Sequence, residues 1–152
     1  IKLIFVGPDE NVNLKNDLMD YVKENKLQNN VIFTGSRHDI NTFYALADLV
    51  ITASTDPEAF GRVAIEAQAM GKFIIASNHG GSKETVIDNE TGYLFTPNDV
   101  EDLTKKLENS IESEIYKQPE TIRSCINHIK ENFTKIRMCD ETIKFYKTVL
   151  DK

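Results

Sequence analysis

The chain has 152 residues, with 24 acidic and 18 basic side chains and a formal net charge of −6. This length predicts one domain, residues 1–152, that can bury its own core without disulfides or metals. The acidic balance argues against nucleic acid or an anionic membrane as the main partner, because both attract a basic surface. Cys125 and Cys139 are too few for a disulfide scaffold or a four-thiolate metal site. No apolar run approaches the ~20 residues of a membrane span.

Short apolar segments alternate with amphipathic segments along the chain. In chain order, the expected elements are a strand at 1–6, a helix at 11–26, a strand at 31–34, a short helix at 39–47, a strand at 49–52, a helix at 61–70, a strand at 73–76, a short helix after Gly81, a strand at 92–95, and helical stretches at 99–117, 119–131 and 134–151. This alternation predicts an α/β fold, a Rossmann-like doubly wound parallel sheet of about five strands with C-terminal helices.

Polar loops follow the first four of these strands, and three of them contain glycine. They occupy residues 7–10, 35–38, 53–60 and 77–82. Ligands of doubly wound sheets bind outside the carboxyl ends of the strands. We therefore expect the functional site in these loops.

The segment at residues 56–71, DPEAFGRVAIEAQAMG, is the most informative part of the sequence. Glu58 lies in the loop before the expected helix and Glu66 lies inside it. A carboxylate is costly to bury without a partner, and the two oxygens of a carboxylate match the cis-diol of a ribose. Between them, Phe60 and Gly61 bring backbone amides and the positive end of the helix dipole to one point, which predicts an anion site. This layout fits a nucleotide-linked sugar. Taken singly, Glu58 is more simply explained as a favourable charge near the helix N-terminus, and Glu66 as part of a solvated helix face.

The same segment resembles the Glu-x7-Glu hallmark of the retaining glycosyltransferases known as glycosyl transferases group 1. The strand and turn at 31–35, Ala47-Asp48, the glycine loop at 79–84 and the turn at 89–94 also resemble this family, in the family's order. The resemblance covers residues 1–108 well and the last helices weakly. It implies the C-terminal, donor-binding domain of a GT-B fold, lacking the first strand–helix unit of that domain and the whole N-terminal acceptor domain.

The resemblance also implies roles for individual residues. Glu66 would bind the ribose hydroxyls, and Glu58 would lie beside the donor sugar as the catalytic carboxylate. The other donor-binding candidates are Phe60, Gly61, Arg62, Ser36, Arg37, Gly80 and Gly81. Simpler roles stay open for several of them: a surface charge for Arg37, core filling for Phe60 and a tight turn for Gly80-Gly81.

The activity implied by the resemblance is transfer of a sugar, with retention, from a nucleoside-diphosphate sugar to a glycan or lipid acceptor in polysaccharide biosynthesis. No cofactor or metal is expected, because cationic side chains and a helix dipole can stabilise the leaving diphosphate. The full-length protein would be a cytoplasmic enzyme, with any membrane association supplied by the missing half. This chain alone is expected to be inactive.

The expected partners are the nucleoside-diphosphate sugar and the N-terminal domain of the same enzyme, and nucleic acid is not expected. The missing strand would be central in the family's sheet, so strand exchange or a homo-oligomer could compensate in the isolated chain. Three alternatives remain: a truncated or split gene product, a non-catalytic nucleotide-binding module, and an epimerase-like GT-B domain.

Overall fold

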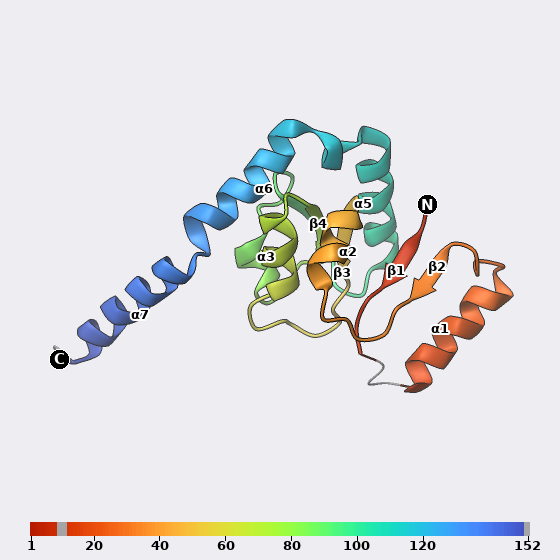
Figure 1. The fold of residues 1–152 in the computed structure, drawn as a ribbon, viewed down its shortest axis with the longest axis horizontal. Helices are drawn as coiled ribbons and strands as arrows, with labels where there is room; N and C mark the ends of the chain where they lie inside the picture. Colours follow the sequence, from red (N-terminus) through yellow and green to blue (C-terminus); the bar gives the residue numbers. More distant parts are fainter. Residues whose placement is uncertain (9–11, 151–152) are drawn as a thin grey trace. The chain divides into compact units, whose positions relative to one another are not determined.

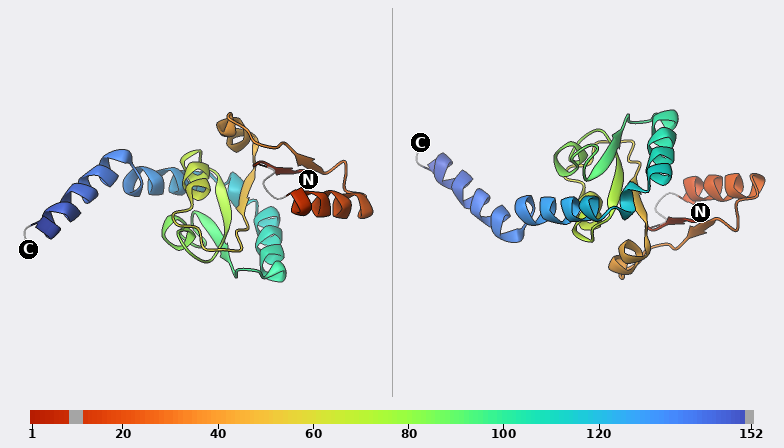
Figure 2. Two further views of the ribbon diagram at one scale, coloured as in Figure 1. Left: turned by 90° about the horizontal axis from the view of Figure 1, so that it is seen from below. Right: turned by 90° about the horizontal axis from the view of Figure 1, so that it is seen from above.

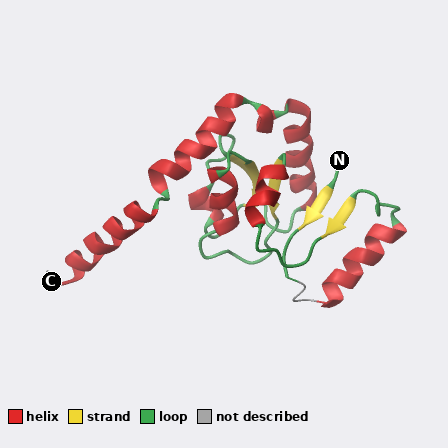
Figure 3. Ribbon diagram, in the orientation of Figure 1, coloured by secondary structure: helices red, strands yellow, loops and turns green. Residues whose placement is uncertain are grey.

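The computed structural model describes residues 1–8 and 12–150, so the loop residues Asp9 and Glu10 lie outside the described residues. The chain divides into two compact units, residues 1–43 and 44–152. Helices and parallel strands alternate along it (Figure 3), which confirms the expected α/β class. The five strands form two sheets, of two and three strands, rather than the single sheet we expected.

The first unit is a two-stranded parallel sheet with one long helix. Its elements are β1 (Leu3–Phe5), α1 (Val12–Glu24) and β2 (Val31–Phe33). Leu3, Phe5 and Ile32 are 40% to 46% exposed, and α1 buries no residue. The apolar run of β1 is therefore only partly covered, because two strands and one helix cannot cover both faces of a parallel sheet.

The second unit holds the buried core. Its elements, beginning with a helix that contains the boundary between the units, are α2 (Ile40–Leu46), β3 (Leu49–Thr52), α3 (Arg62–Ala69), β4 (Phe73–Ser77), α4 (Ser82–Thr85), β5 (Gly92–Phe95), α5 (Val100–Ser113), η1 (Ile115–Lys117), α6 (Pro119–Asn132) and α7 (Lys135–Leu150). The three strands are parallel in the order β3-β4-β5. The central strand β4 is buried along its whole length, as its unbroken apolar run predicts.

Helices of the second unit pack on this sheet and on one another. α3 contacts β3, β4 and α6, and α5 contacts β4 and β5. Figures 1 and 2 show α6 running beside α3, with α7 extending from it away from the three-stranded sheet. The buried Cys125 of α6 places its Sγ 3.4 Å from the carbonyl oxygen of Thr91, so α6 is anchored to the turn before β5.

The helical stretch expected at 99–117 is interrupted. α5 begins after Asp99, whose carboxylate accepts a hydrogen bond from the Asp102 amide at 3.0 Å. It ends at Ser113, because Glu114 has φ 49° and this left-handed conformation stops the helical ladder before η1. Within the described residues, no helix combines the length and the apolar character needed to cross a membrane.

Candidate functional site

The segment that carries Glu58 and Glu66 follows β3 and enters α3, as predicted. α3 begins after Gly61, which has φ 77° and ψ 53°, a left-handed conformation that glycine adopts without strain. No side chain caps this end of the helix. The first amides of α3, at Arg62 and Val63, are thus left without a capping side chain, at the positive end of the helix dipole.

The glycine loop after β4 lies directly against this segment. The amide of Gly81 donates a hydrogen bond to the carbonyl oxygen of Glu58 at 2.8 Å. A Cβ on Gly80 would lie 2.3 Å from the Glu58 carbonyl oxygen, and a Cβ on Gly81 would lie 2.4 Å from the carbonyl carbon of Phe60. The structure therefore brings together the loops after β3 and β4, and close backbone contact accounts for both glycines.

Glu58 is half-buried and held by a serine that the sequence analysis missed. The Ser54 hydroxyl donates a hydrogen bond to Glu58 Oε1. The Ser54 carbonyl oxygen accepts hydrogen bonds from Ser77 Oγ and His79 Nε2, each at 2.9 Å. The available signal for Ser54 was its place directly beyond the carboxyl end of β3, where doubly wound sheets gather polar groups.

The carboxylate of Glu58 also lies beside the start of α3. A Cβ on Gly61 would be 3.6 Å from Glu58 Oε2. A negative charge at this position interacts favourably with the helix dipole. The geometry thus suits both the simple stabilising role of Glu58 and a role beside a bound sugar.

Glu66 lies on α3 with a hydrogen-bond donor on each carboxylate oxygen. Tyr44 Oη donates to Oε2 and Arg62 Nη2 donates to Oε1, both at 3.0 Å. The Glu66 side chain is 36% exposed, whereas the Arg62 side chain is 83% exposed. Burial, and then the hydrogen bond to Glu66, raise the pKa of Tyr44 well above its usual range, so its hydroxyl stays protonated and donates.

Phe60 does not fill the core, because it is 49% exposed. Its ring meets Phe133 edge-on, with centroids 6.0 Å apart, and Phe133 in turn meets His128 at 5.3 Å. Phe133 ends α6, at the junction with α7. The loop between Glu58 and α3 is therefore supported by an aromatic group from the C-terminal helices.

Ser36 and Arg37 belong to the first unit, so their relation to Glu58 and Glu66 stays a prediction. Arg37 makes two hydrogen bonds of 2.9 Å to the carboxylate of Asp39. This pairing raises the pKa of Arg37 and lowers the pKa of Asp39. The guanidinium carbon also lies 5.5 Å from the ring centroid of Phe43. Arg37 is thus a paired surface charge in this structure.

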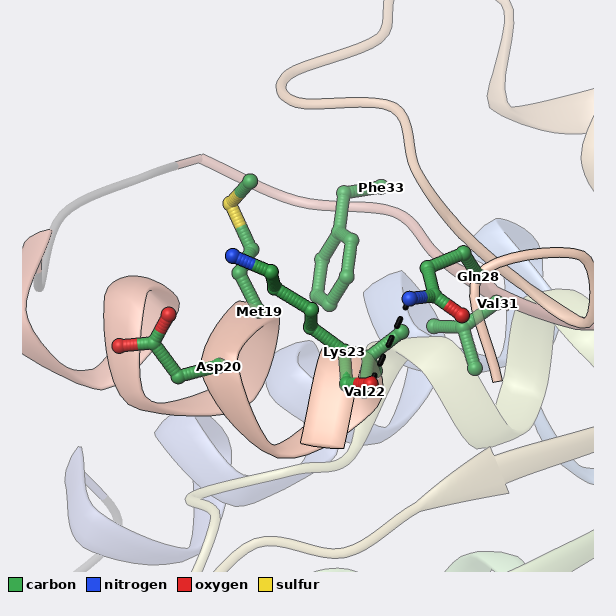
Figure 4. Close-up of a pocket in the computed structure, with 7 residues that line it drawn as sticks. All are labelled: Met19, Asp20, Val22, Lys23, Gln28, Val31 and Phe33. Carbon is green, nitrogen blue, oxygen red and sulfur yellow. Dashed lines mark hydrogen bonds between the residues drawn. The ribbon is translucent and has the colours of Figure 1, made fainter. Parts of the chain in front are cut away.

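A cavity of 560 Å³ lies in the first unit, between α1 and β2 (Figure 4). Its lining consists of Met19, Asp20, Val22, Lys23, Gln28, Val31 and Phe33. None of the predicted site residues lines it. Across residues 1–8 and 12–150, no three His, Cys, Asp or Glu side chains gather in a way that could hold a metal ion.

Comparison with known proteins assigns the chain to a family. The family model "Glycosyl transferases group 1" matches residues 1–131. The lipopolysaccharide 1,2-N-acetylglucosaminetransferase of Salmonella typhimurium is 40% identical over 100 residues, covering 61% of this chain and 26% of that protein. Protein CapJ of Staphylococcus aureus is 31% identical over 155 residues, covering 99% of this chain and 38% of that protein.

A solved structure shows the same fold. The crystal structure of HepE from Anabaena in complex with UDP aligns with a TM-score of 0.88 and 27% identity, covering 97% of this chain and 41% of that chain. The chain spans less than half the length of each of these proteins. The chain belongs to the glycosyl transferases group 1 family.

Proposed function

We propose that this chain is the donor-binding domain of a retaining GT-B glycosyltransferase and that its second unit binds a nucleoside-diphosphate sugar. The observation that carries the proposal is the arrangement around α3. A single short segment carries, in chain order, Glu58, the uncapped amides at the start of α3, and Glu66. Membership of the family and the UDP bound to HepE support the same ligand class.

Each part of this segment suits one part of such a ligand. Glu66 has one donor on each oxygen, and each oxygen retains a further lone pair for the two hydroxyls of a ribose. The amides at Arg62 and Val63 suit the diphosphate, because uncapped N–H groups and the helix dipole attract anions. Glu58, close to Gly61, would contact the hydroxyls of the transferred sugar.

The proposed reaction needs no metal from this chain. The oxygen of an acceptor hydroxyl forms a bond to the anomeric carbon on the face that the diphosphate leaves. The bond from that carbon to the diphosphate breaks, and the diphosphate takes the electron pair and the proton of the hydroxyl. Dipole and cationic groups would stabilise the leaving diphosphate. The acceptor, a glycan or a lipid, would bind to the N-terminal domain of the full-length enzyme, which we place in the cytoplasm.

Calorimetry with UDP as the probe tests the proposal. We expect the chain to bind UDP and to bind 2′,3′-dideoxy-UDP more weakly. Glu66→Ala should cost about 1–3 kcal/mol of UDP binding, because the hydrogen bonds are made by a charged group. Glu108→Ala on α5, which removes an exposed helical glutamate, is the matched control and should leave binding unchanged.

Two results would contradict the proposal. Unchanged UDP binding by Glu66→Ala would exclude the ribose role, and sugar transfer by the isolated chain in a radiolabelled-donor assay would exclude the need for the N-terminal domain. A non-catalytic module or a split gene product would bind the nucleotide but would also fail to transfer sugar when joined to an N-terminal domain.

A further inference from the structure

Tyr44 is a buried side chain that contacts the proposed site without a role in the proposed function. We propose that Tyr44 is a positioning residue, whose hydroxyl fixes the Glu66 carboxylate in the orientation that receives a ribose diol. This inference rests on the proposed function and extends it to a residue 22 positions away in the sequence.

The contact between Tyr44 and Glu66 joins a buried group to a partly exposed one. Tyr44 is 5% exposed, on α2, and its hydroxyl donates to Glu66 Oε2 at 3.0 Å. Leaving a buried hydroxyl without a hydrogen-bond partner costs its full desolvation free energy. The hydrogen bond from Tyr44 is therefore retained. Packing fixes the ring of Tyr44. The Glu66 carboxylate must therefore adopt the orientation that accepts the hydrogen bond from the Tyr44 hydroxyl.

Arg62, the other partner of Glu66, cannot fix the carboxylate in the same way. Its side chain is 83% exposed and reaches Glu66 from the preceding turn of the same helix. Ion pairs of this exposed kind contribute little, because solvent screens them and both side chains lose freedom. Tyr44 is consequently the partner that sets the plane of the carboxylate.

The orientation matters because a cis-diol presents two donors at a fixed spacing. With Tyr44 on Oε2 and Arg62 on Oε1, the carboxylate keeps one acceptor site on each oxygen. A carboxylate that rotates freely would present these two sites together only part of the time. Loss of the hydroxyl should therefore weaken ribose recognition and leave recognition of the base and phosphates intact.

The test compares UDP with 2′,3′-dideoxy-UDP by calorimetry on the whole chain. Tyr44→Phe keeps the ring and removes the hydroxyl. We expect its affinity for UDP to fall about 3- to 10-fold, typical of the loss of one hydrogen bond. Its affinity for dideoxy-UDP should equal that of the wild type. Tyr93→Phe, which removes a hydroxyl from the ring that packs on Phe73, is the matched control and should bind both probes normally.

The possible outcomes separate the two proposals. Unchanged UDP affinity in Tyr44→Phe, or an equal loss for both probes, would overturn the positioning role. If the wild-type chain does not prefer UDP over dideoxy-UDP, the proposed ribose site is wrong, and this inference fails with it.

A measurement without ligand keeps the contact itself testable if Tyr44→Phe does not fold. Tyrosine labelled with ¹³C at the ring carbon bearing the hydroxyl reports the surroundings of the Tyr44 hydroxyl by NMR at neutral pH. Glu66→Ala should shift the Tyr44 signal, because the hydroxyl loses the carboxylate oxygen that accepts from it at 3.0 Å, whereas Glu108→Ala should leave the signal in place. An unshifted Tyr44 signal in Glu66→Ala would show that the hydroxyl does not bind Glu66 and would overturn the inference.

Discussion

The contact between the glycine loop and the Glu58 loop can be tested by adding a single methyl group. In Gly80→Ala the new Cβ would lie 2.3 Å from the Glu58 carbonyl oxygen and 2.8 Å from the Glu58 nitrogen. Both atoms belong to backbone, so relief requires a movement of the loop itself. Gly80 also has φ 54°, a conformation in which any other residue is strained.

Gly61→Ala is a matched variant that separates the cost of backbone strain from the cost of steric overlap. Gly61 has φ 77°, but a Cβ there would meet Thr85 Oγ1 at 3.4 Å and Glu58 Oε2 at 3.6 Å, which are ordinary contacts. Gly61→Ala should therefore cost only the conformational strain, about 1–2 kcal/mol. Gly80→Ala should cost the same strain plus about 1–3 kcal/mol for forced overlap in a packed region.

The assay is urea unfolding followed through the amide NMR signals of β4, which report the free energy of unfolding of the second unit. We expect Gly80→Ala to be less stable than Gly61→Ala by about 1–3 kcal/mol. It should also shift the amide signals of residues 58–60, because the loop has moved. Equal stabilities for the two variants, with unshifted loop signals, would refute the close contact between the two loops.

Three further predictions concern the core, a helix cap and the thiols. Phe73→Ala should lower the free energy of unfolding by about 3–5 kcal/mol in the same urea titration, because this side chain is fully buried on the central strand. Asp99→Ala should cost about 1 kcal/mol by removing the side-chain acceptor at the start of α5, and Asp99→Asn should restore most of it. Cys139 is exposed and should react with a thiol reagent in the folded chain, whereas Cys125 should react only after unfolding. Burial raises the pKa of Cys125 from 9.0 to about 12, so its contribution to stability is present below pH 9 and is lost as the pH rises through that window, which a Cys125→Ala comparison would measure.

Much of the local structure followed from residue periodicity alone. The strand expected at 49–52 is β3, and the strand expected at 73–76 is β4 with one added residue. Hydrophobic runs bounded by glycine and polar residues carry this information locally. The break in the helix at Glu114 was not predicted. A non-glycine residue in the left-handed conformation cannot be recognised from an amphipathic pattern.

The site was predictable in part. Glu58, Gly61 and Glu66 stood out because three residue types with related chemistry follow one another in a single segment. Ser54 and Tyr44, which hold the two carboxylates, did not stand out. A serine in a polar loop and a tyrosine on a short amphipathic helix are common, and only folding reveals which group their hydroxyls reach.

The charge and length of the chain, its α/β class and the apolar run of β4 were determined by the sequence itself, through composition and periodicity. Tertiary structure decided the rest. It divided the five strands between two sheets, left β1 partly exposed, placed Gly80 and Gly81 against the Glu58 loop, and gave each glutamate its hydroxyl partner. The physical reason is that periodicity records which face of an element is apolar, whereas burial and hydrogen bonding depend on elements that are distant along the chain and meet only in the fold.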